Sequence, residues 1–310
     1  MLTVLQTALE VGLIYGLVAL ALFISFSILN IADLSTDGCF TLGCAVGAML
    51  TIAGHPILAL FAAMAAGMLS GYVTAFLQTR LGVESILAGI ISNTGLYTIN
   101  LAVMGFSSNV SITGVDTVFS LFKGLVGGQW SRLILLALIA AVIVIVLIRF
   151  FGTSLGLSIR ATGDSLDMVS ASSINPKATI TIGLCLANAL TALSGCLIGE
   201  YNKFCDINLG TGMVTIALAS LIIGEVFAGH RGGVGKRIVC VVLGSIVYRF
   251  IIALALRLNI SAEYFKLVSA VIVAVAIAAP NMKGYVRLAK IKSNARRLRA
   301  LSGKGDETDA

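Results

Sequence analysis

The feature that most constrains this sequence is a series of apolar runs, each about twenty residues long, that recur as far as residue 281. A helix needs roughly 20 residues to cross a hydrocarbon layer of about 30 Å. Charged residues make up only 11% of the chain, against about 25% in soluble domains. Gly, Ala and Ser occur throughout the runs, which is typical of closely packed helices and not of alternating barrel strands. The sequence therefore predicts an all-α polytopic membrane protein.

Polar breaks divide the chain into nine predicted membrane-spanning helices. These cover residues 5–29, 37–54, 56–79, 84–105, 131–151, 178–200, 211–229, 237–256 and 264–281. The stretch 106–130 is too polar and glycine-rich to span and is expected to form an external loop. We expect one transmembrane domain over residues 1–282, followed by a polar tail at 283–310. The count depends most on the spans 37–54 and 56–79, which meet at His55 and Pro56, because one span could be divided or two joined there.

The distribution of Lys and Arg predicts the orientation. With the C-terminus inside, fifteen basic residues fall on the cytoplasmic side and five on the other. Cytoplasmic loops are enriched in Lys and Arg, so we expect a cytoplasmic C-terminus, and nine spans then place the N-terminus outside. The basic tail is explained by anionic membrane lipid, and nucleic-acid binding is not expected because the tail directly follows a predicted span. Glu10 and the absence of Lys or Arg before Arg80 argue against a cleaved signal peptide.

No residue pattern predicts catalysis, a metal or another cofactor. The two histidines, His55 and His230, fall in predicted turns on opposite sides of the membrane, which disfavours an intramembrane enzyme. The cysteines show no Cys-x-x-Cys or Cys/His ligand spacing, and small buried apolar residues are a better interpretation than a metal site or disulfides. They are Cys39, Cys44, Cys185, Cys196, Cys205 and Cys240.

Two segments of the chain are faintly similar to each other. Residues 12–50 and 183–221 each contain a span, a polar Gly/Ser/Asp loop and a second span rich in small residues. In the predicted topology the first loop is cytoplasmic and the second external, so the copies run in opposite directions. Inverted repeats are common in transporters, where the pathway lies between the halves near the midplane. Shared hydrophobic composition remains an alternative origin of the similarity.

The segment 152–177 is the longest polar stretch between spans on the predicted cytoplasmic side. Within it, residues 164–173 are expected to form a short surface helix, with Asp164 or Ser165 as N-cap and Asp167 in the first turn. Pro176 is expected to stop the following helix from extending backward. Because a linker needs only a few residues, about 25 residues here indicate a docking surface for a soluble partner.

At this segment the sequence resembles a known family. Residues 159–164 read Ile-Arg-Ala-Thr-Gly-Asp and 173–175 read Ser-Ile-Asn, similar to the coupling loop of permeases of the branched-chain amino acid and ribose family of ABC importers. Ser165 stands for the usual Asn and Ser173 for the usual Gly. Two further blocks resemble the family's pattern. In residues 16–47 the run 33–35 matches and Asp37 is inserted, and in residues 209–235 Glu225 takes the place of a glycine. The resemblance extends from about residue 10 to 281.

The resemblance implies a division of labour among several chains. Two permeases form the pathway, two cytoplasmic ABC ATPases drive it, and an external substrate-binding protein delivers the solute. A homodimer is favoured, and the substrate would be a small polar solute such as an amino acid, as in the tryptophan-like single-permease systems. The chain itself would hydrolyse nothing, because residues 229–237 only superficially match a phosphate-binding loop. The implied ATPase-coupling residues are Ile159, Arg160, Ala161, Thr162, Gly163, Asp164, Asp167, Ile174 and Asn175.

Polar residues within predicted spans need an explanation, because a carboxylate at a helix centre costs about 2.5–3.5 kcal/mol on insertion scales. Glu10, Glu200 and Arg249 are interpreted as structural. Asn93 and Asn188 either bridge helices or face the pathway, and Glu225 either pairs with Arg231 or Arg237 or belongs to an inner gate. The candidate pathway residues are Asn30, Asp33, Ser35, Asn93, Asn188 and Glu225.

Small residues recur at fixed spacing within the predicted spans. The pairs Gly12/Gly16, Gly43/Gly47 and Gly67/Gly71 have the Gly-xxx-Gly spacing that permits close helix packing. An ion-coupled secondary transporter of a small solute is the main alternative function. Such a protein would also contain inverted repeats and buried carboxylates, but it would not need the long segment 152–177.

Overall fold

The computed structural model describes residues 2–128, 130–229, 232–257 and 271. The predicted tail, Arg231 and, apart from Val271, the predicted span 264–281 lie outside the described residues. The described chain is helical apart from loops and two short strands. Its elements are α1 (Leu2–Leu22), the π-helical η1 (Phe23–Ile28), α2 (Thr36–Ile52), α3 (Pro56–Thr79), α4 (Ser85–Val103), β1 (Asn109–Ser111), α5 (Val118–Val126), α6 (Ser131–Phe151), α7 (Ser154–Asp164), α8 (Leu166–Ala171), α9 (Pro176–Asn202), β2 (Phe204–Asp206), α10 (Met213–Ala228) and α11 (Val234–Arg257).

Six of the described helices are long and apolar enough to cross a membrane. They lie at Val4–Ile28, Pro56–Thr79, Ser85–Val103, Ser131–Phe151, Pro176–Asn202 and Val234–Ala255. The predicted spans 37–54 and 211–229 also form apolar helices, α2 and α10, but these have only 17 and 16 residues. Each of the two short helices follows a break in the chain. The predicted all-helical membrane fold is therefore confirmed, while the count of nine spans stays a prediction.

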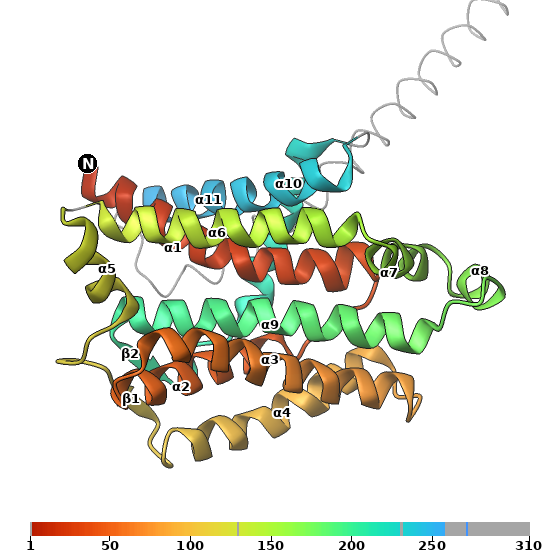
Figure 1. The fold of residues 1–310 in the computed structure, drawn as a ribbon, viewed down its shortest axis with the longest axis horizontal. Coiled ribbons are helices and arrows are strands. Elements are labelled where there is room, and N and C mark those ends of the chain that lie inside the picture. The colour runs from red at the N-terminus through yellow and green to blue at the C-terminus, as the bar shows by residue number, and fades with distance from the viewer. Residues whose placement is uncertain (1, 129, 230–231, 258–270, 272–310) are drawn as a thin grey trace, which may run out of the picture.

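Helices α1 and α9 run antiparallel through the middle of the bundle (Figure 1). Helices α6 and α11 lie on the α1 side, and α2, α3 and α4 lie on the α9 side. The segment containing α7 and α8 projects from one end of the bundle, with α8 farther out. Helix α5 and the strand pair lie at the opposite end, where β1 and β2 pair antiparallel with Val110 opposite Cys205.

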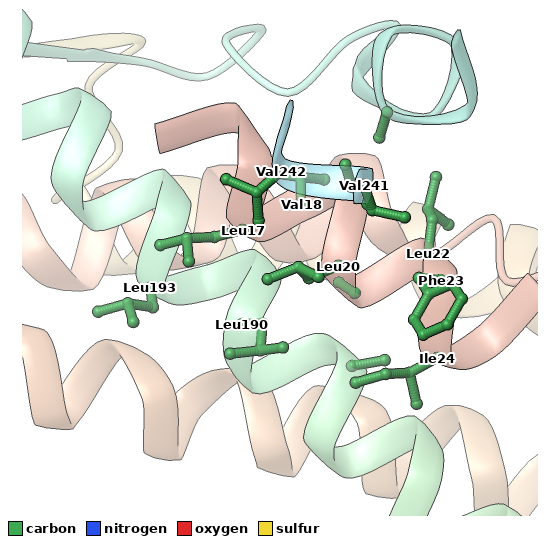
Figure 2. Packing of buried hydrophobic residues seen from close by; sticks show 14 of the residues in the cluster. Leu17, Val18, Leu20, Leu22, Phe23, Ile24, Leu190, Leu193, Val241 and Val242 are labelled. Atoms are coloured by element: carbon green, nitrogen blue, oxygen red, sulfur yellow. The ribbon is translucent and has the colours of Figure 1, made fainter. Parts of the chain in front are cut away.

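The core is centred on α1 and η1, which are buried on almost all sides from Ile14 to Ile24. Figure 2 shows Leu17, Leu20 and Phe23 of this segment among side chains of neighbouring helices, with Leu190 on α9 and Val241 on α11. A helix that is hydrophobic all round belongs in the interior of a bundle. The first helix is therefore the central element of the described bundle.

Glycines allow the helices to approach closely, as their spacing predicts. A Cβ on Gly67 of α3 would collide with the backbone carbonyl of Asn188 on α9. The other five glycines of the predicted pairs are also in tight contact with a facing helix: α11 faces Gly12 and Gly16, and α9 faces Gly43, Gly47 and Gly71. The predicted packing role of the three Gly-xxx-Gly pairs is confirmed.

Candidate functional site at the two chain breaks

The first break separates η1 from α2 and is organised by Asp33. The chain is irregular from Leu29 to Ser35, and Asn30 adopts a left-handed conformation with φ 56°. The Asp33 carboxylate is 3% exposed and accepts hydrogen bonds from the Ser35 amide at 2.8 Å and the Ser35 hydroxyl at 2.6 Å. An aspartate that bonds the backbone two residues on stabilises a turn, and its charge is favoured at the N-terminus of α2.

Asn188 of α9 completes a buried polar cluster at this break. Its amide nitrogen donates to the second carboxylate oxygen of Asp33 at 2.9 Å and to the Leu184 carbonyl at 3.3 Å. Asn188 is 1% exposed, and its amide oxygen has no hydrogen-bond partner among the described residues. A buried acceptor without a partner costs about 1–3 kcal/mol, so such an atom is unusual in a purely structural position. The structure thus brings together three predicted pathway residues, Asp33, Ser35 and Asn188.

The second break follows α9 and is anchored on α2 by Asp37. The two carboxylate oxygens of Asp37 accept hydrogen bonds from the backbone amides of Gly212 and Val214, both at 2.9 Å. The Thr41 hydroxyl accepts a third bond, from the Gly210 amide, at 3.1 Å. The amides of Gly212 and Val214 lie at the start of α10, where the helix dipole favours a negative charge. The N-terminal turns of α2 therefore hold the beginning of α10.

Asn93 and Asn30 lie beside the cluster without hydrogen-bonding to it. Asn93 of α4 is half-buried, and its amide oxygen lies so near Gly38 of α2 that a Cβ there would approach it within 2.6 Å. Asn30 is exposed in the first break. Asn100, also on α4, donates to the Gly38 carbonyl at 3.0 Å. Asn100 therefore bridges helices, and Asn93 lies close to the start of α2.

Glu225 lies in a separate polar contact. It pairs with Arg237 at 2.6 Å, and the Ser27 hydroxyl donates to the same carboxylate oxygen at 2.5 Å. The Arg237 guanidinium also lies 5.1 Å from the centre of the Phe23 ring. Of the two predicted ion-pair partners, Arg237 forms the pair, and Arg231 lies outside the described residues. The contact joins α10, α11 and η1.

The segment 152–177 forms two helices, where one was predicted. The predicted surface helix is present as α8: the Ser165 hydroxyl accepts a 3.4 Å bond from the Met168 amide, and Asp167 lies in the first turn. The preceding helix α7 was not predicted and begins at a Thr153 cap. Pro176 starts α9 as expected, and Asn175 caps it by accepting a bond from the Lys177 amide at 3.0 Å.

The residues of the coupling motif divide between two faces. Ile159 is fully buried, Gly163 packs on the backbone of Ile28 in η1, and the Thr162 hydroxyl lies 2.8 Å from that of Thr179 on α9. These contacts seat α7 on the bundle. The outward residues are exposed, among them Asp164, Asp167 and Asn175, whereas Arg160, Ala161 and Ile174 are half-buried.

Helix α8 adds an exposed apolar surface that the motif does not include. Leu166 is 53% exposed and Met168 is 64% exposed. Because α8 projects beyond the bundle, these two apolar side chains are candidates for a contact with another protein. The signal was available in the sequence as two apolar residues on either side of Asp167.

The residues interpreted as structural form hydrogen bonds or stacking contacts. Glu200 accepts bonds from the Thr51 hydroxyl at 3.1 Å and from the Val118 amide of α5 at 2.8 Å. Glu10 accepts bonds from Gln6 and from the Tyr201 hydroxyl, each at 2.9 Å. The Arg249 guanidinium lies 3.8 Å from the centre of the Tyr15 ring. Within the part of the chain that the structure describes, no three His, Cys, Asp or Glu side chains are placed to hold a metal ion.

A bundle of apolar helices with two interior breaks, held together by polar side chains, is typical of membrane transport proteins. The comparisons with known proteins agree. Residues 4–277 match the family described as branched-chain amino acid transport system / permease component, and the chain belongs to this family of transport permeases. It is therefore a multi-pass membrane protein and a transport subunit, not a catalytic one.

Two curated relatives are similar over most of their length. The chain is 32% identical over 272 residues to the tyrosine transport system permease protein of Clostridioides difficile (strain R20291), covering 87% of this chain and 89% of that protein. It is 31% identical over 277 residues to an uncharacterized protein of Rickettsia prowazekii (strain Madrid E), covering 88% and 96%. No solved structure shows significant similarity to the chain.

Proposed function

We propose that the chain is the translocation subunit of an ATP-driven importer of the ABC class, located in the inner membrane, that carries an amino acid. The observation that carries this proposal is that helix α8, which follows α7, projects from the bundle and exposes Leu166 and Met168. Family membership supports it, since the matching family is a transport-system component. The similar Clostridioides difficile permease is named for tyrosine, so tyrosine and tryptophan are the first substrates to test.

The proposed partners follow from this role. Two cytoplasmic ATPases each receive one α8 in a surface groove, and their closure rocks the permease helices. An external binding protein delivers the amino acid, and a second copy of this chain completes a homodimer. Residues 159–164, Asp167, Ile174 and Asn175 form the coupling segment. The anionic lipid surface attracts the basic tail at 283–310, which follows the transmembrane domain 1–282.

The proposed topology has nine spans, an external N-terminus and a cytoplasmic C-terminus, built as an inverted repeat. Helices α1, α2 and α3 correspond to α9, α10 and α11. Three observations support this: α1 and α9 are antiparallel, each precedes a break and a short helix, and α1 packs on α11 as α9 packs on α3. Loop 106–130 is then external, at the end opposite α8.

The proposed pathway passes between the two breaks. Asp33, Ser35 and Asn188 present carboxylate, hydroxyl and amide groups that suit the charged ends of an amino acid. In the described state Asp33 and Asn188 bond each other, so the substrate would replace this bond. Asn30, Asn93 and Glu225 are the further pathway candidates.

Two variants test the ATPase contact. Met168→Ser should weaken co-purification of the ATPase in mild detergent, because Met168 is 64% exposed on α8 and would lie in the contact. Leu121→Ser, on α5 at the opposite end of the bundle, is the matched control and should retain the ATPase. Asp164→Arg should leave the protein folded but separate ATP hydrolysis from uptake in proteoliposomes.

The outcomes separate the proposed function from its alternative. Loss of the ATPase from Met168→Ser alone supports the importer and the coupling segment together. If wild type carries no ATPase under conditions that preserve a known importer complex, the ion-coupled secondary transporter gains support. Buried Asp33 is the observation that favours this alternative, and uptake should then depend on a proton or cation gradient and on Asp33.

A further inference from the structure

A cavity of about 300 Å³ lies between the C-terminal end of α3 and the N-terminal end of α9. It is lined by Arg80, just after α3, and by Lys177, in the first turn of α9. Both side chains are exposed. Among the described residues the single ion pair is Glu225–Arg237, so neither cation has a carboxylate partner there. The cavity therefore carries two positive charges that the described chain does not neutralise.

The rest of the cavity is aromatic and apolar. Tyr72, Phe76 and Ile182 line it and are 52%, 43% and 37% exposed. Tyr72 lies eight residues before Arg80, which is about 12 Å along a helix. Because α3 is long and apolar enough to cross the membrane, this distance reaches from the membrane surface into the hydrocarbon layer. One end of the cavity is therefore charged and interfacial, and the other faces lipid chains.

We propose that this cavity binds one anionic phospholipid, with its phosphate between Arg80 and Lys177 and the upper part of an acyl chain along Tyr72 and Phe76. The positive N-terminal end of the 27-residue helix α9 adds to the attraction. Basic pockets between membrane helices bind phospholipid headgroups by this chemistry. A dissolved phosphate ion would make no contact with the aromatic wall, whereas an acyl chain would. The wall therefore favours a lipid as the occupant.

The first test measures lipid retention by the full chain. Wild type is placed in nanodiscs of phosphatidylcholine with increasing phosphatidylglycerol, and native mass spectrometry counts the phosphatidylglycerol that it retains. Arg80→Gln/Lys177→Gln should bind about 30-fold more weakly, since each basic residue near an anionic surface contributes about fivefold. Arg149→Gln/Lys236→Gln is the control, because it removes two cations that are also exposed but do not line the cavity. Equal loss in both variants, or no loss in the first, would overturn the proposal.

The second test uses wild type alone and stays informative if the double variant does not fold. Phosphatidylglycerol with a photoreactive group on the upper acyl chain should cross-link to peptides containing residues 72–80 or 175–182. Neutral phosphatidylcholine should compete poorly, and millimolar inorganic phosphate should not displace the lipid. Three outcomes would each refute a lipid site here. Inorganic phosphate could displace the lipid, the cross-link could be blocked only by an added soluble protein, or the cross-links could be confined to other helices.

Discussion

Replacing Asp37 by alanine should weaken the junction between the two breaks of the chain. The Asp37 carboxylate accepts bonds of 2.9 Å from the amides of Gly212 and Val214, and it lies 175 and 177 residues away from them in the sequence. In the Asp37→Ala variant the first amides of α10 lose their acceptor. Because α10 has only 16 residues, the loss of its N-terminal anchor affects a large part of the helix.

The expected loss of stability follows from these two bonds. A hydrogen bond to a charged group contributes about 1.5–3 kcal/mol, so two contribute about 3–6 kcal/mol. Asp37 is half-buried, and water can reach part of the vacated site, which favours the lower end, about 3 kcal/mol. The Asp37→Asn variant keeps one neutral acceptor oxygen and turns an NH2 donor toward the other amide, so it should lose at least about three quarters as much.

The assay is the apparent unfolding temperature of the purified protein, measured by size exclusion after heating. A loss of about 3 kcal/mol corresponds to a decrease of about 6–12 °C for Asp37→Ala, at about 2–4 °C per kcal/mol. Asp116→Ala removes an exposed carboxylate whose oxygen accepts a bond from Ser120 at 3.1 Å, and it should change stability by less than about 0.5 kcal/mol. If Asp37→Ala behaves like Asp116→Ala, the anchoring role of Asp37 is wrong.

Three further substitutions probe helix packing, coupling and the inner ion pair. Gly67→Val should destabilise the protein by about 1–3 kcal/mol in the same heating assay, because its side chain would collide with α9, whereas Gly95→Val has open space and should be tolerated. Gly163→Ala should push α7 away from η1 and lower the substrate transported per ATP in proteoliposomes; Gly152→Ala, with no atom nearer than 3.4 Å to the added carbon, should leave that ratio unchanged. Glu225→Gln should cost about 1 kcal/mol or less in the heating assay, because the ion pair is about one-third exposed.

Hydrophobicity predicted the membrane helices well because the bilayer requires long apolar segments. The predicted ranges 56–79 and 131–151 coincide with α3 and α6, and α9 extends its predicted range by only two residues at each end. The signal reports length and polarity, which are local properties. It does not report that α2 and α10 end short of a full crossing, because that depends on where each break lies in the fold.

The elements held by distant contacts were not predictable in the same way. Helix α7 has the sequence SLGLSIRATGD, in which glycine and serine weaken helix propensity. The helix exists because Ile159 is buried and Gly163 fits against Ile28, and such packing stabilises most protein helices. The strand pair β1–β2 joins residues almost a hundred positions apart, with Asn109 opposite Asp206. Neither strand is long enough to show a period of two.

In the candidate site too, the polar residues could be predicted from the sequence, but their contacts with distant residues could not. Asp33, Ser35 and Asn188 were identifiable as polar residues next to or within apolar runs, but their pairing across 155 residues was not. Asp37 was not selected as a site residue, although a carboxylate at the start of an apolar run has the signature of a helix N-terminal acceptor. Its partners are backbone amides, which carry no sequence signal.

The contacts of α7 determine how a movement of the proposed coupling segment would reach Asp33 and Asn188. Helix α7 contacts η1, which leads to Asp33, and it also contacts α9, which carries Asn188. The contact with η1 is backbone against backbone at Gly163, so it leaves no side chain to absorb a displacement.

The contact of α7 with α9 is different, because it includes the hydroxyl pair of Thr162 and Thr179. Hydroxyl groups can rotate and exchange partners. If the proposed coupling holds, a push on α8 reaches η1 through the Gly163 contact and reaches α9 through the Thr162 contact and through residues 172–175. Under the proposed function, any difference between the movements of η1 and α9 would separate Asp33 from Asn188 and free both side chains for a substrate, so we propose the bond between them as a point at which ATPase closure acts on the pathway.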